Sequence, residues 1–301
     1  MRKDACSIRF DVAVPVQKSD HRVPEGLDCE VETSVHDEAC NGLHGPLARA
    51  AAMSRTSVQF RIASYNTHKC RGIHGTISPD RVIRVIEEFD ADILCLQEIV
   101  DAEGGTRKYD QARQIAEAFP KLNAAFGETR PLHGGRYGNM LMTRFPILET
   151  RTHDITKSRR EERGVLQCAL EVGRGQTVNV FNVHLGTGYM ERRRQIEVLI
   201  GEEILAQPEL SGPRIVIGDF NEWTRGLTTR LLQQSFLSDR PIRNRRSART
   251  YPGVLPFLSL DHCYYEAPLE MEGTKIWRSR KAMIASDHLP LIADFRLIAK
   301  E

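Results

Sequence analysis

Residues 216–223, VIGDFNEW, form an apolar run that ends in two polar side chains able to do chemistry. Asp219 and Asn221 are two residues apart, and strand side chains alternate between faces, so we expect both to point the same way. A carboxylate and a carboxamide at one exit from a sheet could hold a phosphate or a water molecule. They could equally cap a helix that follows the strand, so the pair alone does not decide its function.

Similar polar side chains end several other predicted strands. They are Asn66, Glu98, Asn182, His184, Asp261, Asp287 and His288. Each has an ordinary structural explanation when taken singly: a Glu after a strand is usually a helix cap, a His in a strand is usually a core residue, and Ser-Asp-His-Leu-Pro favours a turn. So many coincidences in one chain are harder to explain than one site assembled from strand ends.

The elements that must position these side chains follow one another from residue 57 onward. Alternating or continuous apolar runs predict strands at 58–66, 91–98, 139–148, 165–172, 176–185, 214–220, 259–266 and 290–298. Apolar positions at helical spacing predict a helix that begins at Pro79 with Ser78 as its cap, and further helices at 109–119, 189–205 and 226–236. Roughly ten strands and four helices fit two packed sheets flanked by helices, an α/β fold in one domain at 57–301.

The composition is that of an ordinary globular protein, because the 301 residues are 41% hydrophobic and 27% charged. No run approaches the roughly 18 apolar residues of a membrane span. Asp4, Arg9 and Asp11 interrupt the short apolar stretches near the N-terminus, so no signal peptide is predicted and a cytoplasmic protein is expected. The seven cysteines show no CxxC spacing, which favours reduced structural thiols over a zinc site or disulfides.

Residues 1–56 show no sustained periodicity and few aromatic side chains, and we interpret them as a poorly ordered N-terminal extension. Met53 lies just before the first predicted strand. The change in composition there leads to the hypothesis that translation begins at Met53. Peptides from residues 1–52 in the native protein would contradict it.

The net charge is only +2, but basic residues cluster within the domain. Lys and Arg gather at 157–163, 192–194, 240–249 and 278–281. Such clusters suit anionic partners, including nucleic acid, anionic lipid and phosphoesters. Most arginine runs are nevertheless solvated faces, so the clusters alone do not establish an anionic partner.

Taken in order along the chain, the polar strand ends resemble the motif set of the endonuclease/exonuclease/phosphatase superfamily, the deoxyribonuclease I-like proteins. The motifs are Asn66, LQE (96–98), NVHL (182–185), GDFN (218–221), LD (260–261) and SDH (286–288). The resemblance implies a four-layer α/β sandwich, in which two central mixed β-sheets are flanked by helices. It also implies a metal-dependent hydrolase of phosphodiesters, with chemistry like that of a nuclease.

Three further stretches resemble a bacterial branch of this superfamily whose substrates are unsettled. They are YNTHKCRG (65–72), ERRRQIEVL (191–199) and TYPGVLPFLSLD (250–261). That branch is related to a domain of eukaryotic proteins that act in lipid-anchor remodelling. His262 departs from the family pattern, because many relatives carry Arg or Tyr after the Asp. The departure concerns local substrate contacts rather than Asp261 itself.

The resemblance implies a divalent cation, Mg²⁺ with Mn²⁺ as an alternative. Glu98 would be its first ligand, with Asn66 nearby and Asp287 completing the shell. Hard oxygen ligands suit Mg²⁺, which keeps several waters and needs only one or two protein carboxylates. The ion would act mainly as a Lewis acid on the phosphoryl oxygen.

Five catalytic side chains are implied as well. His288 would be the general base or a phosphate contact, with its ring oriented by Asp261. Asp219 would orient or activate the attacking water, and Asn221 would donate its amide to the phosphate. His184 would donate to a non-bridging oxygen or protonate the leaving group.

Three functions remain open from the sequence. A nuclease is favoured by the basic clusters. A phosphodiesterase acting on a phospholipid or lipid head group is favoured by the apolar loop 254–258, provided that the loop is exposed. A binding module without activity is disfavoured by the complete motif set.

Trp223 fits either packing against a helix or stacking on a base or lipid edge. The partner expected is therefore a phosphoester substrate; no stable protein partner is implied, and we expect a monomer.

Overall fold

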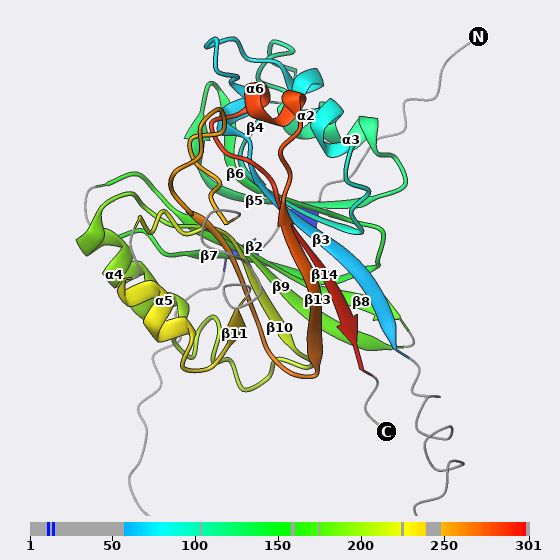
Figure 1. Cartoon of the computed structure of the whole chain (residues 1–301), viewed down its shortest axis with the longest axis vertical. Helices are drawn as coiled ribbons and strands as arrows, with labels where there is room; N and C mark the ends of the chain where they lie inside the picture. The colour runs from blue at the N-terminus through cyan, green and yellow to red at the C-terminus, as the bar shows by residue number, and fades with distance from the viewer. Residues whose placement is uncertain are drawn as a thin grey trace, which may run out of the picture.

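Two β-sheets pack face to face at the centre of the protein, and helices cover their outer faces (Figure 1). The structure is a computed structural model that describes residues 11–12, 14–15, 57–102, 104–157, 160–173, 175–223, 226–238 and 248–298. The layers run helices, sheet, sheet, helices. This arrangement confirms the predicted four-layer α/β sandwich.

Each sheet has seven strands, and the two-residue strands β1 and β2 form one edge of each. The first sheet has, in spatial order, β1 (Asp11–Val12), β5 (Asn123–Leu132), β6 (Gly135–Thr143), β4 (Ile93–Asp101), β3 (Val58–Asn66), β14 (Leu291–Leu297) and β13 (Leu269–Ile276). The second has β11 (Leu237–Ser238), β12 (Asp261–Tyr265), β10 (Arg214–Asp219), β9 (Gln176–His184), β8 (Gly164–Gly173), β7 (Ile147–Asp154) and β2 (Val14–Pro15).

The helices divide between the two outer faces. α2 (Pro79–Ile86), α3 (Gln111–Ala118) and α6 (Arg280–Ala285) pack on the first sheet, while α4 (Tyr189–Leu199) and α5 (Leu227–Leu232) pack on the second. A separate apolar cluster fills the space between the sheets. Strands such as β4 are therefore buried on both faces, which explains their nearly continuous apolar sequence. Among the described residues, no helix combines the length and the apolar character needed to cross a membrane.

Each sheet has one parallel pair of long strands near its centre. The pairs are β3–β4 in the first sheet and β9–β10 in the second, and the long strands on either side of each pair run antiparallel to it. The carboxyl ends of parallel strands meet at the same edge of a sheet. Asn66 at the end of β3 donates a 3.0 Å hydrogen bond to Asp219 at the end of β10. Both pairs therefore deliver their carboxyl ends to the same end of the sandwich.

The sequence pattern misses elements at the sheet edges and misplaces some ends. β13 is an edge strand with alternating charged residues. Its sequence has no apolar run that would predict a strand. The predicted strand 139–148 spans a turn, because β6 ends at Thr143 and β7 begins at Ile147. The helix predicted at 189–205 ends at Leu199, and turns follow it. Ser78 stands at the cap position of α2, but its side chain accepts no capping hydrogen bond.

Most of the predicted extension lies outside the described residues. Within 1–56, the structure describes β1, which pairs in parallel with β5, and β2, which pairs in parallel with β7. Three of the seven cysteines also lie in the part that is not described. The other four, Cys70, Cys95, Cys168 and Cys263, are buried, as a structural role predicts.

A buried polar bridge joins the two sheets beneath the end where the parallel pairs meet. Asn182 of β9 accepts a 2.7 Å hydrogen bond from Gln97 Nε2 of β4. The Asn182 amide donates to the backbone oxygens of Leu96 and Met140, each at 3.0 Å. These are backbone groups of the opposite sheet, so this one side chain fixes the position of β9 against β4 and β6.

We expect Asn182→Ala to lower the free energy of unfolding by about 3 kcal/mol, because three hydrogen bonds are lost and buried partners are left unsatisfied. Urea denaturation measures this change. Asn179→Ala is the matched control: Asn179 lies on the same strand, is almost equally buried, and among the described residues its side chain donates to Ser211 O only. An equal loss in the two variants would contradict the role of the bridge.

Candidate active site

Asp219 lies at the centre of the site, where the two sheets meet, and only 1% of it is exposed. Its Oδ2 accepts the hydrogen bond from Asn66, and it lies 3.7 Å from the Nε2 atoms of both His184 and His288. Burial raises the pKa of Asp219 to about 7, although the neighbouring His288 opposes this increase. A carboxylate in this position can orient a water molecule or accept its proton.

Strand register explains why these side chains converge on Asp219. Asp219 is paired with His184 across the parallel β9–β10 ladder and with Asp261 across the antiparallel β10–β12 ladder. The strands can approach because residue 218 is glycine: a Cβ there would lie 1.9 Å from Val183 O. The close approach of the backbone thus requires the glycine of the GDFN motif. The chemistry of the site requires the acid that follows it.

Asn221 turns back onto Asp219 immediately after the strand ends. Its backbone adopts a φ of +49°, a conformation that Asn tolerates better than most residues. Its N–H donates to Asp219 Oδ1 at 2.9 Å, and its amide donates to Leu185 O at 2.9 Å. The acid and the amide are therefore neighbours, as predicted, but through a local turn that holds Asp219 rather than through strand alternation alone.

His288 is paired with a second buried carboxylate. Its Nδ1 lies 3.0 Å from Asp261 Oδ2, so Nε2 is directed toward Asp219. Burial alone would lower the pKa of His288, but the charges of Asp261 and Asp219 outweigh it and raise this pKa to about 10. Ser286 positions the turn, because its hydroxyl donates to Asn66 O at 2.8 Å and accepts the His288 N–H at 3.2 Å.

Glu98 reaches the site because β4 is irregular at that point. The pairing of β4 with β6 shifts register between Leu96 and Ile99, and Glu98 has a φ of +61°. Such bulges redirect a side chain that a regular strand would place elsewhere. Glu98 Oε1 lies 3.3 Å from Asn66 Nδ2 and 4.0 Å from His184 Nε2. Burial alone would raise the pKa of Glu98, but His184 and Lys69 hold it well below its usual range.

Lys69 forms an ion pair with Glu98 that the sequence analysis did not predict. It lies in the short 3-10 helix η1 (His68–Cys70), all three residues of which have φ between 50° and 55°. Successive left-handed residues other than glycine are strained and need support from their surroundings. His68 N–H donates to Asn66 Oδ1 at 3.0 Å, and Gln111 donates to Lys69 O at 2.8 Å. In the sequence, the only sign of this contact is HKC (68–70). It lies within the stretch 65–72 that resembles the bacterial branch.

His184 is buried between the carboxylates of Glu98 and Asp219. Burial, together with the charge of Arg163, lowers the pKa of His184 well below its usual value, so its ring is neutral near pH 7. A neutral imidazole with its Nε2 toward the site can donate a hydrogen bond to an oxygen of a bound anion. The structure thus gives the two histidines different charges through their different partners.

The structure brings the eight predicted site residues to one end of the sandwich, in different roles. Asp287 Oδ1 lies 3.5 Å from His68 Nδ1, at the rim of the site. Asn66 turns its amide nitrogen toward Glu98 and Asp219, while its oxygen accepts from His68. Asn182, by contrast, belongs to the core bridge between the sheets. Trp223 is 60% exposed, which excludes packing in the core.

The donor set fits a hard divalent cation. Oxygen ligands are offered by Glu98 and Asp287, and ligand atoms of Asp219, Asp261 and His288 all lie within 4.8 Å of one another. The ammonium of Lys69 already balances the charge of the Glu98 carboxylate. A carboxylate that is buried and kept ionised, beside a partly exposed cationic side chain, suits exchange of that partner for a metal ion.

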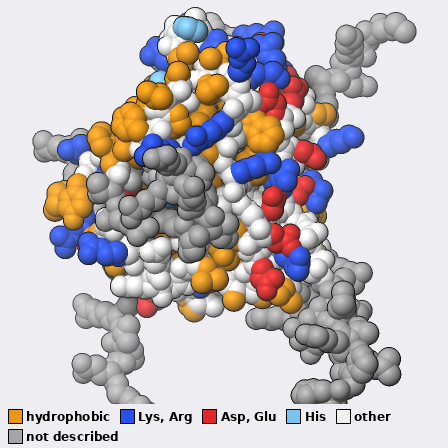
Figure 2. All heavy atoms as spheres, in the orientation of Figure 1, with side chains coloured by type: hydrophobic (Ala, Val, Ile, Leu, Met, Phe, Trp, Pro, Cys, Tyr) orange, Lys and Arg blue, Asp and Glu red, His pale blue; other side chains and the backbone are white. Residues whose placement is uncertain are grey.

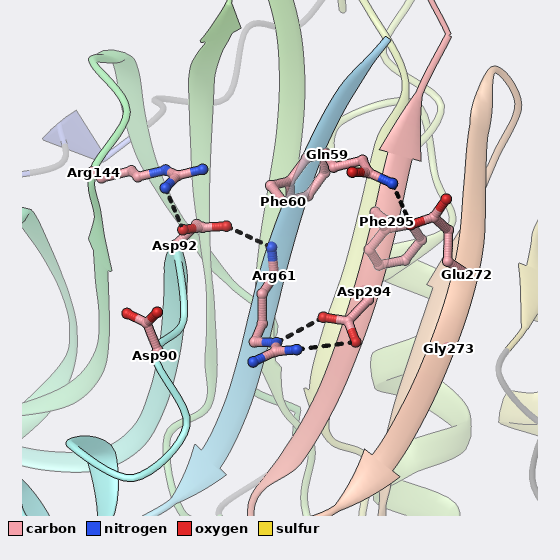
Figure 3. A pocket seen from close by; sticks show the side chains of 10 residues that line it. All are labelled: Gln59, Phe60, Arg61, Asp90, Asp92, Arg144, Glu272, Gly273, Asp294 and Phe295. Atoms are coloured by element: carbon pink, nitrogen blue, oxygen red, sulfur yellow. Dashed lines mark hydrogen bonds and ion pairs between the residues drawn. The ribbon is translucent and has the colours of Figure 1, made fainter.

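A second hollow, of about 450 Å³, lies on the first sheet at the amino ends of β3 and β4 (Figure 3). Its two arginines pair with two of its carboxylates. Arg61 Nε lies 2.7 Å from Asp294 Oδ1, and Arg144 lies 2.9 Å from Asp92. These internal ion pairs, at the opposite end of the strands from Asp219, indicate a solvated sheet face rather than a second catalytic site.

Comparison with known proteins agrees with this architecture. YbhP of Escherichia coli strain K12 is 28% identical over 252 residues, which cover 79% of this chain and 96% of YbhP. Among solved structures, an endonuclease/exonuclease/phosphatase from Beutenbergia cavernae has a TM-score of 0.67 at 19% identity, covering 80% of this chain and 72% of that chain. The mannosyl-6-phosphatase Bt3783 of Bacteroides thetaiotaomicron has a TM-score of 0.65 at 16% identity, covering 78% of this chain and 99% of that chain.

Residues 63–288 match the Endonuclease/Exonuclease/phosphatase family, a span that begins within β3 and ends at His288. It contains each of the six motifs on which the resemblance was based. With the four-layer fold and the convergence of these motifs on Asp219, the chain therefore belongs to the endonuclease/exonuclease/phosphatase family, whose members are phosphoester hydrolases.

Proposed function

We propose that the protein hydrolyses phosphodiester bonds with the help of bound Mg²⁺ or Mn²⁺. One observation carries this proposal: the Asp261–His288 pair, Asp219 and the His184–Glu98 group come from both sheets and meet at one buried carboxylate. A phosphodiester resists hydrolysis because its anionic oxygens repel nucleophiles. A site must neutralise these oxygens, position a water molecule and stabilise the leaving oxygen.

Glu98 and Asp287 would hold the metal ion. Asn66, whose amide nitrogen faces Glu98 while its oxygen accepts from His68, would have to turn its amide to join them. When bound, the ion supplies Lewis-acid polarisation of the phosphoryl oxygen. Lys69 neutralises Glu98 in its absence, and its ammonium is long and flexible enough to turn toward a phosphate instead. Glu98 keeps its orientation through the bulge in β4 and through the Asn66 amide.

The attacking water would be held by Asp219. Asn66 and Asn221 fix the orientation of this carboxylate. Its oxygen can therefore accept a proton from the water without rearranging. His288, held by Asp261 through Nδ1, presents Nε2 to a phosphate oxygen. His184 donates to another non-bridging oxygen. Asn221 therefore positions Asp219 mainly through its backbone N–H, with its side-chain amide at 3.4 Å from Asp219 Oδ2, and the predicted contact of that amide with the phosphate requires the side chain to turn.

Two substrate classes remain for this chemistry. A nuclease is consistent with the basic clusters, and members of one fold act on many phosphoesters, as the mannosyl-6-phosphatase among the similar structures shows. A phospholipid or lipid-head-group phosphodiesterase is favoured by a specific observation: Val254, Leu255 and Phe257 are 54%, 77% and 60% exposed. Product release from bis-p-nitrophenyl phosphate, plasmid DNA and a short-chain phospholipid, each with Mg²⁺, distinguishes the classes.

We expect His288→Ala to lower turnover of bis-p-nitrophenyl phosphate by roughly 10²–10⁴-fold, because the positioned imidazole is lost. His133→Ala is the control, since His133 is exposed in the turn between β5 and β6. Circular dichroism of both variants checks folding. Near-normal turnover in folded His288→Ala protein would refute the catalytic assignment.

Lys69→Met should tighten Mg²⁺ binding by roughly tenfold, because the cation that competes for Glu98 is removed. Isothermal titration calorimetry measures this without turnover. Glu98→Gln should weaken binding in the same experiment. Unchanged affinities in both variants would place the metal on other ligands.

Asn221→Gly and Asn221→Ala separate the amide from the backbone. Both keep the backbone N–H that donates to Asp219 but remove the amide that donates to Leu185 O and to Asp219 Oδ2 at 3.4 Å, so both should lose activity by a similar factor. Only Ala must adopt the positive φ with a Cβ, which costs about 1 kcal/mol. We therefore expect the Ala variant to be less stable to urea than the Gly variant; equal stability of the two would mean that the turn is not strained.

A further inference from the structure

The exposed large apolar side chains of the described residues are concentrated around the end of the sandwich where the site lies. We call this end the mouth of the site. Ten such side chains are at least 41% exposed. Two, Leu148 and Leu237, lie on strands of the second sheet away from the site. The other eight adjoin site residues in the sequence or in space; we call them the apolar rim: Ile73, Tyr189, Met190, Trp223, Val254, Leu255, Phe257 and Ile284.

On one side of the mouth, the rim is joined directly to the turn that carries His288. Gly253 N–H donates to Asp287 O at 2.7 Å, and Leu289 N–H donates to Thr250 O at 2.9 Å. The exposed side chains at 254–257 therefore stand beside the catalytic turn. The loop with Ile73 is tied to α6, because Ile73 N–H donates to Ile284 O at 3.2 Å.

On the other side, the rim follows the site residues of the second sheet. Tyr189 and Met190 form the first turn of α4, which begins shortly after His184 ends β9. Trp223 follows Asn221 by two residues. Apolar side chains thus flank the mouth on the side of each sheet, although exposing them to water is unfavourable.

The segments that carry the rim, apart from that of Trp223, contain more basic than acidic residues. Residues 69–77, 186–194, 248–258 and 278–288 contain nine Lys or Arg and only two Asp or Glu. Arg71, Arg278 and Arg280 are among the exposed ones. Figure 2 shows orange and blue side chains together over the upper left of the molecule, near α6 and α4, whereas red side chains gather on the right.

We propose that the apolar rim and its surrounding basic residues dock the mouth of the site on an anionic phospholipid surface. Ile73, Val254 and Leu255 have no aromatic face to stack on a nucleic-acid base. Aliphatic and aromatic side chains interleaved with Lys and Arg are instead typical of surfaces that lie in the membrane interface, where the apolar groups enter the acyl boundary and the cations meet phosphates. This inference rests on the proposed function, because it assigns the site a phosphoester presented at a lipid surface.

Sedimentation with sucrose-loaded vesicles tests the docking without any turnover. The full-length protein, in EDTA, should sediment with vesicles of phosphatidylglycerol and phosphatidylcholine, and much less with phosphatidylcholine alone. Leu255→Ser/Phe257→Ser should lower the partition coefficient at least about tenfold, since each buried CH₂ contributes to binding. Arg278→Gln/Arg280→Gln should weaken binding to the anionic vesicles in a salt-dependent way. Leu148→Ser, which is 55% exposed but away from the mouth, should bind as the unmodified protein does.

Three outcomes would overturn the proposal. The first is no binding to anionic vesicles, and the second is equal binding by the Leu255→Ser/Phe257→Ser and Leu148→Ser variants. The third is that the rim binds another partner. Binding of a single-stranded DNA oligonucleotide through the same residues would show this, and so would a dimer that dissociates in the double variant. Because hydrolysis of bis-p-nitrophenyl phosphate is measured separately, failure of docking is distinguishable from failure of the hydrolase proposal.

Discussion

The site depends on keeping one carboxylate, Asp219, buried where two sheets meet. A buried carboxylate is costly unless charged and hydrogen-bonding partners surround it. Asn66 of the first sheet and His184 and Asn221 of the second supply such partners, with His288 at 3.7 Å. The requirement to satisfy this acid therefore brings together groups from distant parts of the chain, and the same groups are those that a phosphoester hydrolase needs.

The two parallel pairs make this convergence possible. A sheet with a parallel pair at its centre presents two strand ends at one edge, and two such sheets packed face to face present four. The Asn182 bridge fixes the relative position of the pairs just below that edge. Precision at the site is thus set by the core, because a small slide of one sheet would separate Asn66 from Asp219.

Strand ends could be predicted from the sequence because buried strands have continuous apolar runs and the polar residue that follows is conspicuous. Asp219 and His184 were found in this way, whereas His288 precedes its strand, β14, and was found through the SDH motif. The contact of Lys69 with Glu98 could not be found, because it depends on a register shift in β4 and on left-handed backbone at residues 68–70. Neither feature has a periodic signal. Edge strands such as β13 were not predicted because their exposed faces carry alternating charged residues instead of a continuous apolar run.

The inner site and its mouth serve different purposes. The inner groups recognise what all phosphoesters share, an anionic phosphorus centre and a leaving oxygen, and so they do not select a substrate. Selection falls to the surfaces that surround the entrance, which are built from loops and first helical turns rather than from strands. Here those surfaces combine exposed apolar side chains with excess positive charge. A phosphoester at the boundary between water and hydrocarbon would satisfy both, whereas a soluble one would satisfy only the charge.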